Sequence, residues 1–280
     1  MKNHLTLRFR AFATALALTS IFDMATASAA STISAGTITI GSDITYPPYD
    51  FVDGNTPAGF DPEFMAKMSA HMKLKPNFVD TRFASLILGL TGDRYDIIAS
   101  ALYVTPERMK TVDFVPYFVT GGSLIVNGKS SFLPKTMADL CGKRVASLKG
   151  AAWVPTLHEV SDKTCVPAGK AAIDVHEYDT SSEAAQSILS NANDAQYDDA
   201  GVAKMMVDKL HGRIVISSTS VMNPVVSGIG IKKGNAAVKT LVEQAFAQMK
   251  QSGEYQALLK KYNLEAPTDA QIAESTTGAK

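Results

Sequence analysis

The sequence YDIIASALYVTPER, residues 95–108, joins an apolar strand to a polar loop that ends in an arginine. Residues 95–100 have the length and apolar content of a buried strand. Small and hydroxyl-bearing residues follow, then a proline and Arg108. A guanidinium offers two parallel N–H donors that match the two oxygens of a carboxylate. We predict that Arg108 binds a carboxylate; the alternative is a surface arginine at a helix start, paired with Glu107 or Asp113.

Working outward, this strand closes a regular series of strands and helices. Strands are predicted at 37–41, 77–80 and 95–100, and helices at 61–72 and 83–90. In the first helix, Asp61 is a suitable N-cap and Pro62 a suitable first-turn residue. Met65, Met68 and Met72 fall on one face and are predicted to be core. The β-α-β-α-β order predicts a parallel sheet with right-handed crossovers.

A second series of similar size follows. Its strands are predicted at 144–148, 172–178 and 195–198, and its helices at 151–160, 181–190 and 200–210. Further strands are expected at 213–218 and 225–231, and helices at 235–253 and 254–262. The polar end, 265–280, is expected to fray. The sequence therefore predicts an α/β protein with two units and a return segment.

The first 29 residues have the pattern of a secretory signal peptide. Three basic residues precede an apolar stretch at 11–22, and a small-x-small site follows at 27–29. The apolar stretch is shorter than the ~20 residues that span a bilayer. We predict cleavage and export to the periplasm; the alternative is a hydrophobic first helix of the fold.

Composition excludes several functions. The 280 residues carry 27 basic and 27 acidic side chains, without a basic tract for nucleic acid. The segment GGSLIVNGKS, 121–130, lacks the glycine spacing of a phosphate loop and resembles a strand. The five histidines have no metal-ligand spacing. We therefore expect no nucleic-acid partner, no metal and no cofactor.

Two cysteines are present, Cys141 and Cys165. In an exported protein a lone pair indicates one disulfide. The alternative is two buried free thiols.

Six segments in order resemble the family 3 extracellular solute-binding proteins, the periplasmic receptors of amino-acid ABC importers. They are IGSDITYPPYDF, GFDPEFMAKM, DIIASALYVTPERMKTVDFVPYF, DLCGKRVASLKG, NDAQYDDAGVA and GIGIKKGNAAVKTLVEQAFAQMKQSGEYQALLKKY. The resemblance covers about residues 36–262. It implies a two-lobed periplasmic-binding-protein fold of type II, with two crossover strands. Lobe 1 would comprise 35–121 and 225–280, and lobe 2 would comprise 122–224.

The resemblance also implies a ligand site. Arg108 matches the arginine that binds the α-carboxylate, and Asp199, in the second lobe, matches the aspartate that binds the ammonium. Asp199 can alternatively, or additionally, cap the helix at 200–210. The remaining matches are two aromatic residues that sandwich the side chain, two residues close to the ligand backbone and one acid near the pocket: Tyr46, Phe83, Ser100, Ala101 and Asp43.

Three positions depart from the family pattern. Tyr103 stands where the family usually has Ser or Thr, and the usual carboxylate network is then altered. In the KGAAWV loop, Gly150 and Ala152 keep the backbone role of a helix start, but the hydroxyls are lost. Trp153 either stacks on the ligand or packs against its lobe. A more aromatic pocket than usual is expected.

The implied function is a receptor that binds an amino acid or a similar zwitterion and delivers it to a membrane permease. We expect a monomer without catalytic activity. The alternative is an enzyme on the same scaffold, similar to cyclohexadienyl or arogenate dehydratases, which would need an acid or base such as Asp199 or Glu159.

Overall fold

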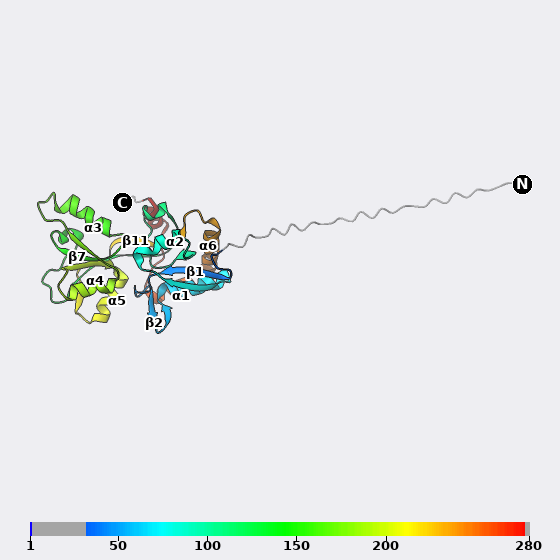
Figure 1. Ribbon diagram of the computed structural model, residues 1–280, viewed down its shortest axis with the longest axis horizontal. Helices are drawn as coiled ribbons and strands as arrows, with labels where there is room; N and C mark the ends of the chain where they lie inside the picture. The colour runs from blue at the N-terminus through cyan, green and yellow to red at the C-terminus, as the bar shows by residue number, and fades with distance from the viewer. Residues whose placement is uncertain (2–31, 278–280) are drawn as a thin grey trace.

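The computed structural model describes Met1 and residues 32–277. The predicted signal peptide, 1–29, otherwise lies outside the described residues. Two masses are visible in Figure 1, one around α1 and α2 and the other around α3, α4 and α5, with β11 between them. Within residues 32–277 we find no helix of the length and hydropathy that a bilayer crossing requires.

The first lobe contains the parallel sheet predicted from the first series. Strand β1 (Thr37–Ser42) pairs in parallel with β4 (Lys75–Asp80) and with β5 (Ile97–Ile98). Two helices lie between these strands in the chain, α1 (Phe60–Met72) and α2 (Leu86–Thr91), the second after a 3₁₀ turn at Phe83–Ser85. A short hairpin, β2 (Phe51–Asp53) and β3 (Thr56–Ala58), was not predicted.

Helix α1 confirms the methionine stripe and corrects its N-cap. Met65, Met68 and Met72 are buried in the core. The helix starts at Phe60 after Gly59, so Asp61 lies inside it rather than at the cap. The Asp61 carboxylate instead accepts hydrogen bonds from the Tyr117 hydroxyl at 2.6 Å and from the Ala101 N–H at 2.8 Å. It therefore anchors the loop that leads to Arg108.

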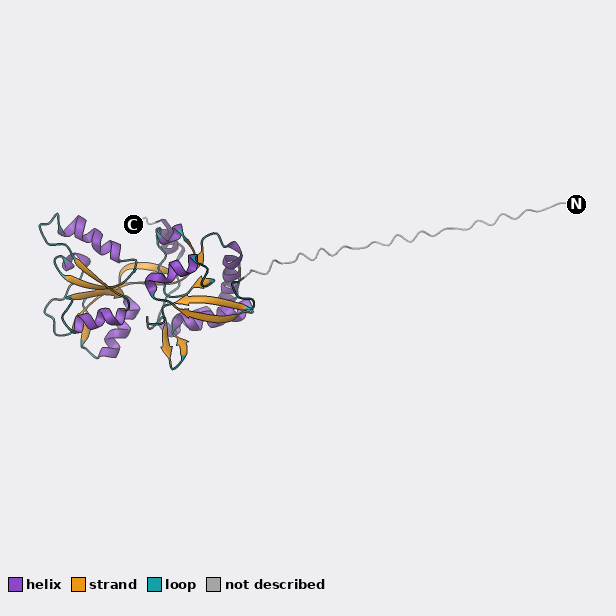
Figure 2. Ribbon diagram, viewed as in Figure 1, coloured by secondary structure: helices purple, strands orange, loops and turns teal. Residues whose placement is uncertain are grey.

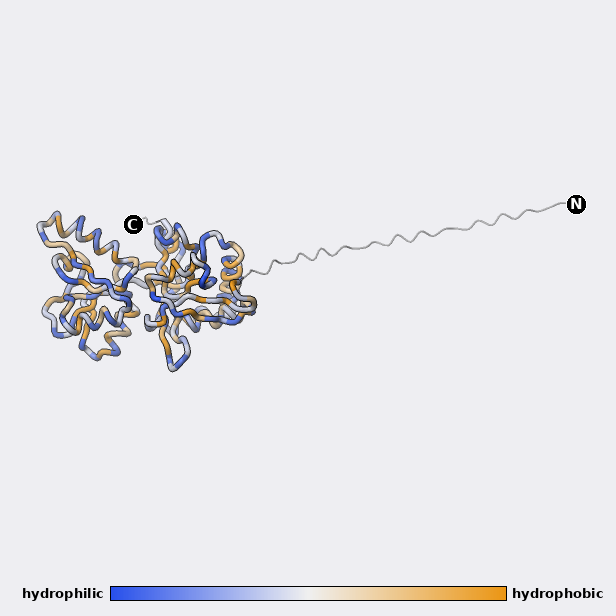
Figure 3. The backbone as a smooth tube through the Cα atoms, in the orientation of Figure 1, coloured by the Kyte–Doolittle hydropathy of each residue, from blue (hydrophilic) through white to orange (hydrophobic). Residues whose placement is uncertain are grey.

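The second lobe contains the second parallel series. Strand β7 (Arg144–Leu148) pairs in parallel with β8 (Asp174–Tyr178) and with β9 (Ala195–Asp199). Its remaining elements are α3 (Val154–Val160), α4 (Ser181–Leu189), α5 (Ala200–Leu210) and β10 (Ile214–Ile216). Figure 3 shows apolar stretches along the strands of both lobes.

Two long antiparallel strands join the lobes, β6 (Val112–Asn127) and β11 (Met222–Lys232). Strand β11 pairs with β5 in the first lobe, and β6 pairs with β9 in the second (Figure 2). At this crossing, a Cβ on Gly122 would collide with the Tyr197 phenol, so only glycine fits without rearrangement. This arrangement confirms the two-lobed class; the exact lobe boundaries stay a prediction.

The chain returns to the first lobe in α6 (Ala236–Gln251), α7 (Glu254–Tyr262) and α8 (Asp269–Thr277). Helix α8 lies within the segment that we expected to fray. None of its residues is buried, so the sequence has no apolar periodicity there that would predict a helix. It contacts β11, where the Val226 N–H donates to Ser275 Oγ at 3.4 Å.

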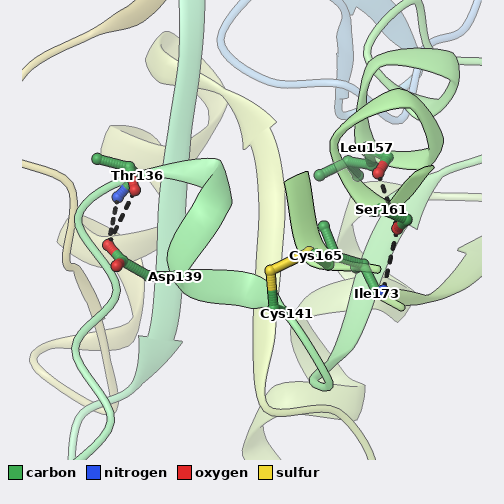
Figure 4. Close-up of a disulfide and its surroundings, with 7 residues drawn as sticks. All are labelled: Thr136, Asp139, Cys141, Leu157, Ser161, Cys165 and Ile173. Atoms are coloured by element: carbon green, nitrogen blue, oxygen red, sulfur yellow. Dashed lines mark hydrogen bonds between the residues drawn. A yellow bond between two sulfur atoms is a disulfide. The ribbon is translucent and has the colours of Figure 1, made fainter. Parts of the chain in front are cut away.

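The predicted disulfide is confirmed. Cys141 and Cys165 are bonded, with their Cα atoms 5.4 Å apart and a sequence separation of 24 (Figure 4). The bond ties the turn at Met137–Leu140 to the helical turn at Ser161–Cys165. Ser161 supports the same region, since its hydroxyl donates to the Leu157 carbonyl and accepts from the Ile173 N–H.

Candidate functional site

The loop after β5 projects from the carboxyl end of the first-lobe sheet, where ligands bind in open α/β folds. Hydrogen bonds to buried residues of the first lobe fix this loop. The Ser100 hydroxyl accepts a hydrogen bond from the Asp43 N–H at 3.0 Å. Ala101 adopts a left-handed conformation, with φ of 45°, and its N–H is bound by Asp61. Both residues are buried, and ligand contact through them stays a prediction.

Arg108 lies at the gap between the lobes. One terminal nitrogen donates to the Tyr103 carbonyl of the first lobe at 2.9 Å, and the other donates to the Gly150 carbonyl of the second lobe at 3.1 Å. The guanidinium also lies 5.4 Å from the centre of the Phe83 ring. Carbonyls of both lobes therefore orient this cation.

The surface pairing proposed as the alternative for Arg108 is absent. Glu107 pairs with Lys110, and Asp113 pairs with Lys233 at 2.9 Å. Among residues 32–277, no carboxylate forms an ion pair with Arg108. Desolvation lowers the pKa of the guanidinium to about 10, which leaves it charged at neutral pH. The side chain is half-buried, and its charged N–H groups are suitable donors for an anion.

Asp199 is the acid at the carboxyl end of β9, and it is fully buried. Its carboxylate caps α5 through the N–H groups of Gly201 and Val202. Three hydroxyls also donate to it, at 2.8, 2.6 and 2.7 Å: those of Tyr49, Tyr103 and Thr120. A carboxylate has about four lone-pair positions, so these donors saturate it. Burial nevertheless raises its pKa.

Tyr103 connects the two predicted ligand-binding charges. Its carbonyl accepts the hydrogen bond from Arg108, and its hydroxyl donates to Asp199. One tyrosine therefore contacts both charged groups, and their joint role in ligand binding stays a prediction. A ligand ammonium can reach Asp199 only by displacing a hydroxyl such as this one.

Other hydrogen bonds cross the gap between residues that the sequence did not single out as a pair. The Tyr46 hydroxyl of the first lobe donates to Asp198 of the second at 2.9 Å. Burial raises the pKa of Asp198 to about 6. Tyr49 and Thr120 were not singled out either, although Tyr49 stands in the same TYPPY segment as Tyr46. The only signal in the sequence was the pair of tyrosines in the TYPPY segment together with the adjacent acids Asp198 and Asp199.

Aromatic rings surround these polar groups. Tyr46 and Phe83 have ring centres 6.3 Å apart. Trp153 lies between Tyr103 and Tyr197, with ring centres 5.6 Å from each. The Trp153 indole N–H donates to the Ser147 hydroxyl at 2.8 Å, so it is anchored in its own lobe. The expected aromatic environment is present, and ligand contact by these rings stays a prediction.

Two further predicted groups already have partners. The Asp43 carboxylate pairs with Arg82 at 2.9 Å and accepts the Phe83 N–H, so it fixes the approach of that ring. The Gly150 N–H donates to Glu177. Helix α3 begins at Val154, so Ala152 precedes it. Among the described residues no cluster of three or more His, Cys, Asp or Glu side chains is arranged to hold a metal.

Two α/β lobes joined by two crossover strands, with an arginine at the gap that pairs with no carboxylate among residues 32–277, define a two-lobed solute-binding protein. The chain belongs to the family of bacterial extracellular solute-binding proteins, family 3, which matches residues 38–265.

Relatives of known role support this assignment. The L-cystine-binding protein TcyJ of Escherichia coli (strain K12) is 27% identical over 229 residues, covering 81% of this chain and 82% of the relative. The histidine-binding periplasmic protein of Salmonella typhimurium is 27% identical over 256 residues, covering 89% and 95%.

Solved structures agree with this fold. An ancestral arginine-binding protein bound to arginine superposes with a TM-score of 0.74, at 28% identity, covering 81% of this chain and 98% of that one. An ancestral amino acid-binding protein, described as a precursor of cyclohexadienyl dehydratase, gives a TM-score of 0.69 at 28% identity, covering 81% and 95%.

Proposed function

We propose that this protein is the periplasmic receptor of an ABC importer and that it binds an amino acid or an amino-acid-like carboxylate between its lobes. Its relatives are described as binding proteins for cystine, histidine and arginine. The observation that carries the proposal is Arg108, a charged guanidinium at the interlobe gap that bonds carbonyls but no acid among residues 32–277.

In this proposal the solute's carboxylate binds the N–H donors of Arg108, next to the Phe83 ring. The ammonium displaces the Tyr103 hydroxyl from Asp199, because that carboxylate is already saturated. The solute then replaces a bond within the protein by its own bond, and it favours the closed arrangement of the lobes. Tyr46, Trp153, Ser100, Ala101, Ala152 and Asp43 line or support the site.

The remaining parts of the proposal concern location and partners. Residues 1–29 direct export to the periplasm and are removed there. The mature chain acts as a monomer and delivers the solute to a membrane permease. The lobes divide at about residues 121/122 and 224/225, where β6 and β11 cross the gap.

The test is a titration of the mature chain with L-histidine, L-arginine and L-cystine, by calorimetry and thermal shift. At least one is expected to bind and to raise the melting temperature. Arg108→Ala should weaken that binding by ~10- to 150-fold, the equivalent of ~1.5–3 kcal/mol for a charged hydrogen bond. Arg144→Ala, which removes an exposed arginine paired with Asp194, should leave it unchanged. If the three amino acids and their close analogues all fail to bind, the proposal is wrong.

The competing function is a dehydratase on this scaffold. The one observation that favours it is the similarity of this chain to an ancestral binding protein described as a precursor of cyclohexadienyl dehydratase. Incubation of the pure protein with prephenate or arogenate separates the two. Turnover would establish the enzyme; a receptor returns the substrate unchanged.

A further inference from the structure

A cavity of about 760 Å³ borders Tyr103 and Trp153 but excludes the charged groups of the proposed site. Neither Arg108 nor Asp199 lines it. Its walls come from both lobes: α3 and β9 on one side, and α8, the start of β11 and the loop 104–106 on the other. In Figure 1, α8 is the dark red helix near the C label, at the edge of the first-lobe mass that faces α3.

Part of the cavity wall is aromatic and aliphatic, and the rest is polar. Tyr103, Trp153 and Tyr197 contribute rings, and Val104 and Val225 contribute aliphatic groups. The indole N–H is already bound to Ser147, so the cavity meets Trp153 as a ring surface. A volume of this size is typical of sites for small organic molecules, ~300–1,000 Å³.

The charges at this cavity are negative. Glu159 of α3 and Glu274 of α8 line it, and no lysine, arginine or histidine is among its lining residues. The Glu159 carboxylate also forms an ion pair with the exposed Lys163 ammonium, at 2.6 Å. Within residues 32–277, Glu274 forms no ion pair, and α8 carries no basic residue. Carboxylates beside aromatic rings favour an ammonium ion, which both groups attract.

We propose that this cavity is a second binding site, for an organic ammonium ion with an apolar or aromatic body. The ring of the occupant lies among Trp153, Tyr103 and Tyr197, and its ammonium lies near Glu274. The site adjoins the Arg108 site, which takes a carboxylate, and Tyr103, Ala152 and Trp153 border both; Arg108 and Asp199 do not line the cavity. Because its walls belong to both lobes, an occupant also favours the closed arrangement.

Phenethylamine is a suitable probe, and Trp153 is a built-in reporter because it is the only tryptophan in the chain. Titration of the mature protein should change the Trp153 fluorescence saturably, and calorimetry should give the same affinity. 3-Phenylpropionate, with a similar body and the opposite charge, should not bind there. Glu274→Gln should weaken phenethylamine binding by about two- to fivefold, as expected for an exposed ion pair.

Thr156→Phe, which fills the cavity from α3, should weaken phenethylamine binding more than tenfold, with far-UV circular dichroism as the folding control. Arg108→Ala should leave phenethylamine affinity unchanged. The proposal is overturned if phenethylamine does not bind at about 10 mM, if both cavity variants bind it normally, or if Arg108→Ala abolishes its binding. Amino-acid binding by the Glu274→Gln variant should equal that of the wild type, so failure of this site is distinguishable from failure of the receptor function.

Discussion

Removal of the Tyr103 hydroxyl should loosen the contact between the lobes. In the structure this hydroxyl donates from the first lobe to Asp199 of the second at 2.6 Å, with a longer contact to the Gly121 carbonyl at 3.3 Å. A hydrogen bond to a charged acceptor contributes ~1.5–3 kcal/mol. Asp199 keeps its other donors in Tyr103→Phe, so the lower end, about 1.5 kcal/mol, is expected.

Opening the lobes breaks this bond, so the whole loss falls on the closed form. A change of about 1.5 kcal/mol raises the ratio of open to closed molecules roughly tenfold. The distribution of distances between the lobes can be measured by double electron–electron resonance. The two spin labels are attached to noncanonical residues that replace Leu88 and Met205, which are exposed on α2 and α5. This labelling leaves the native disulfide intact.

Tyr255→Phe is the matched control. The Tyr255 hydroxyl also donates at 2.6 Å, to the Tyr117 carbonyl, but both residues belong to the first lobe. This variant should lose stability without a change in the interlobe distance distribution. If Tyr103→Phe leaves that distribution unchanged, or if Tyr255→Phe opens the lobes equally, Tyr103 does not hold the lobes together.

Three further outcomes are expected. Replacing Cys141 and Cys165 by serine should lower the free energy of unfolding by ~3 kcal/mol, measured with urea, because the bond closes a loop with a sequence separation of 24; a loss below about 1 kcal/mol would contradict this. The pKa of Asp198 is raised from 3.8 to about 6, so the folded state binds more protons between these values and loses stability as pH rises through them. The free energy of unfolding of the wild type should fall by about 2–3 kcal/mol more than that of Asp198→Asn between pH 4 and 6. If both proteins show the same pH dependence of stability, the raised pKa of Asp198 is refuted. Gly122→Ala should destabilise by ~1–3 kcal/mol, because its Cβ meets the Tyr197 phenol, and an unchanged melting temperature would show that the crossing tolerates it.

Local periodicity was sufficient to predict most of the parallel strands and helices. The predicted strand at 144–148 and the predicted helix at 200–210 match β7 and α5 in their bounds. These elements alternate apolar and polar residues at spacings that depend only on near neighbours. The 95–100 strand is shorter than predicted, because only Ile97–Ile98 pair in β5 before the chain turns into the site loop.

The contacts within the candidate site could not be predicted from local sequence patterns, because they join residues far apart in the chain. Arg108 and Asp199 could be singled out from the family resemblance, but their link through Tyr103 joins residues 96 positions apart in the chain. Only the crossing of β6 and β11 brings these residues together. Tyr49 and Thr120 were missed for the same reason, since nothing in the residue types indicates which distant acid a hydroxyl will meet.

The most direct measurement asks whether Arg108 holds the solute's carboxylate. It is a double-mutant cycle that pairs Arg108→Ala with conversion of the ligand carboxylate to a carboxamide, for example L-arginine against L-argininamide if L-arginine binds. Calorimetry on the four combinations gives the coupling between these two groups. We expect a coupling energy of ~1.5–3 kcal/mol, with the variant no longer distinguishing acid from amide. A coupling energy near zero, with wild type and variant losing equal affinity for the amide, would contradict the assignment.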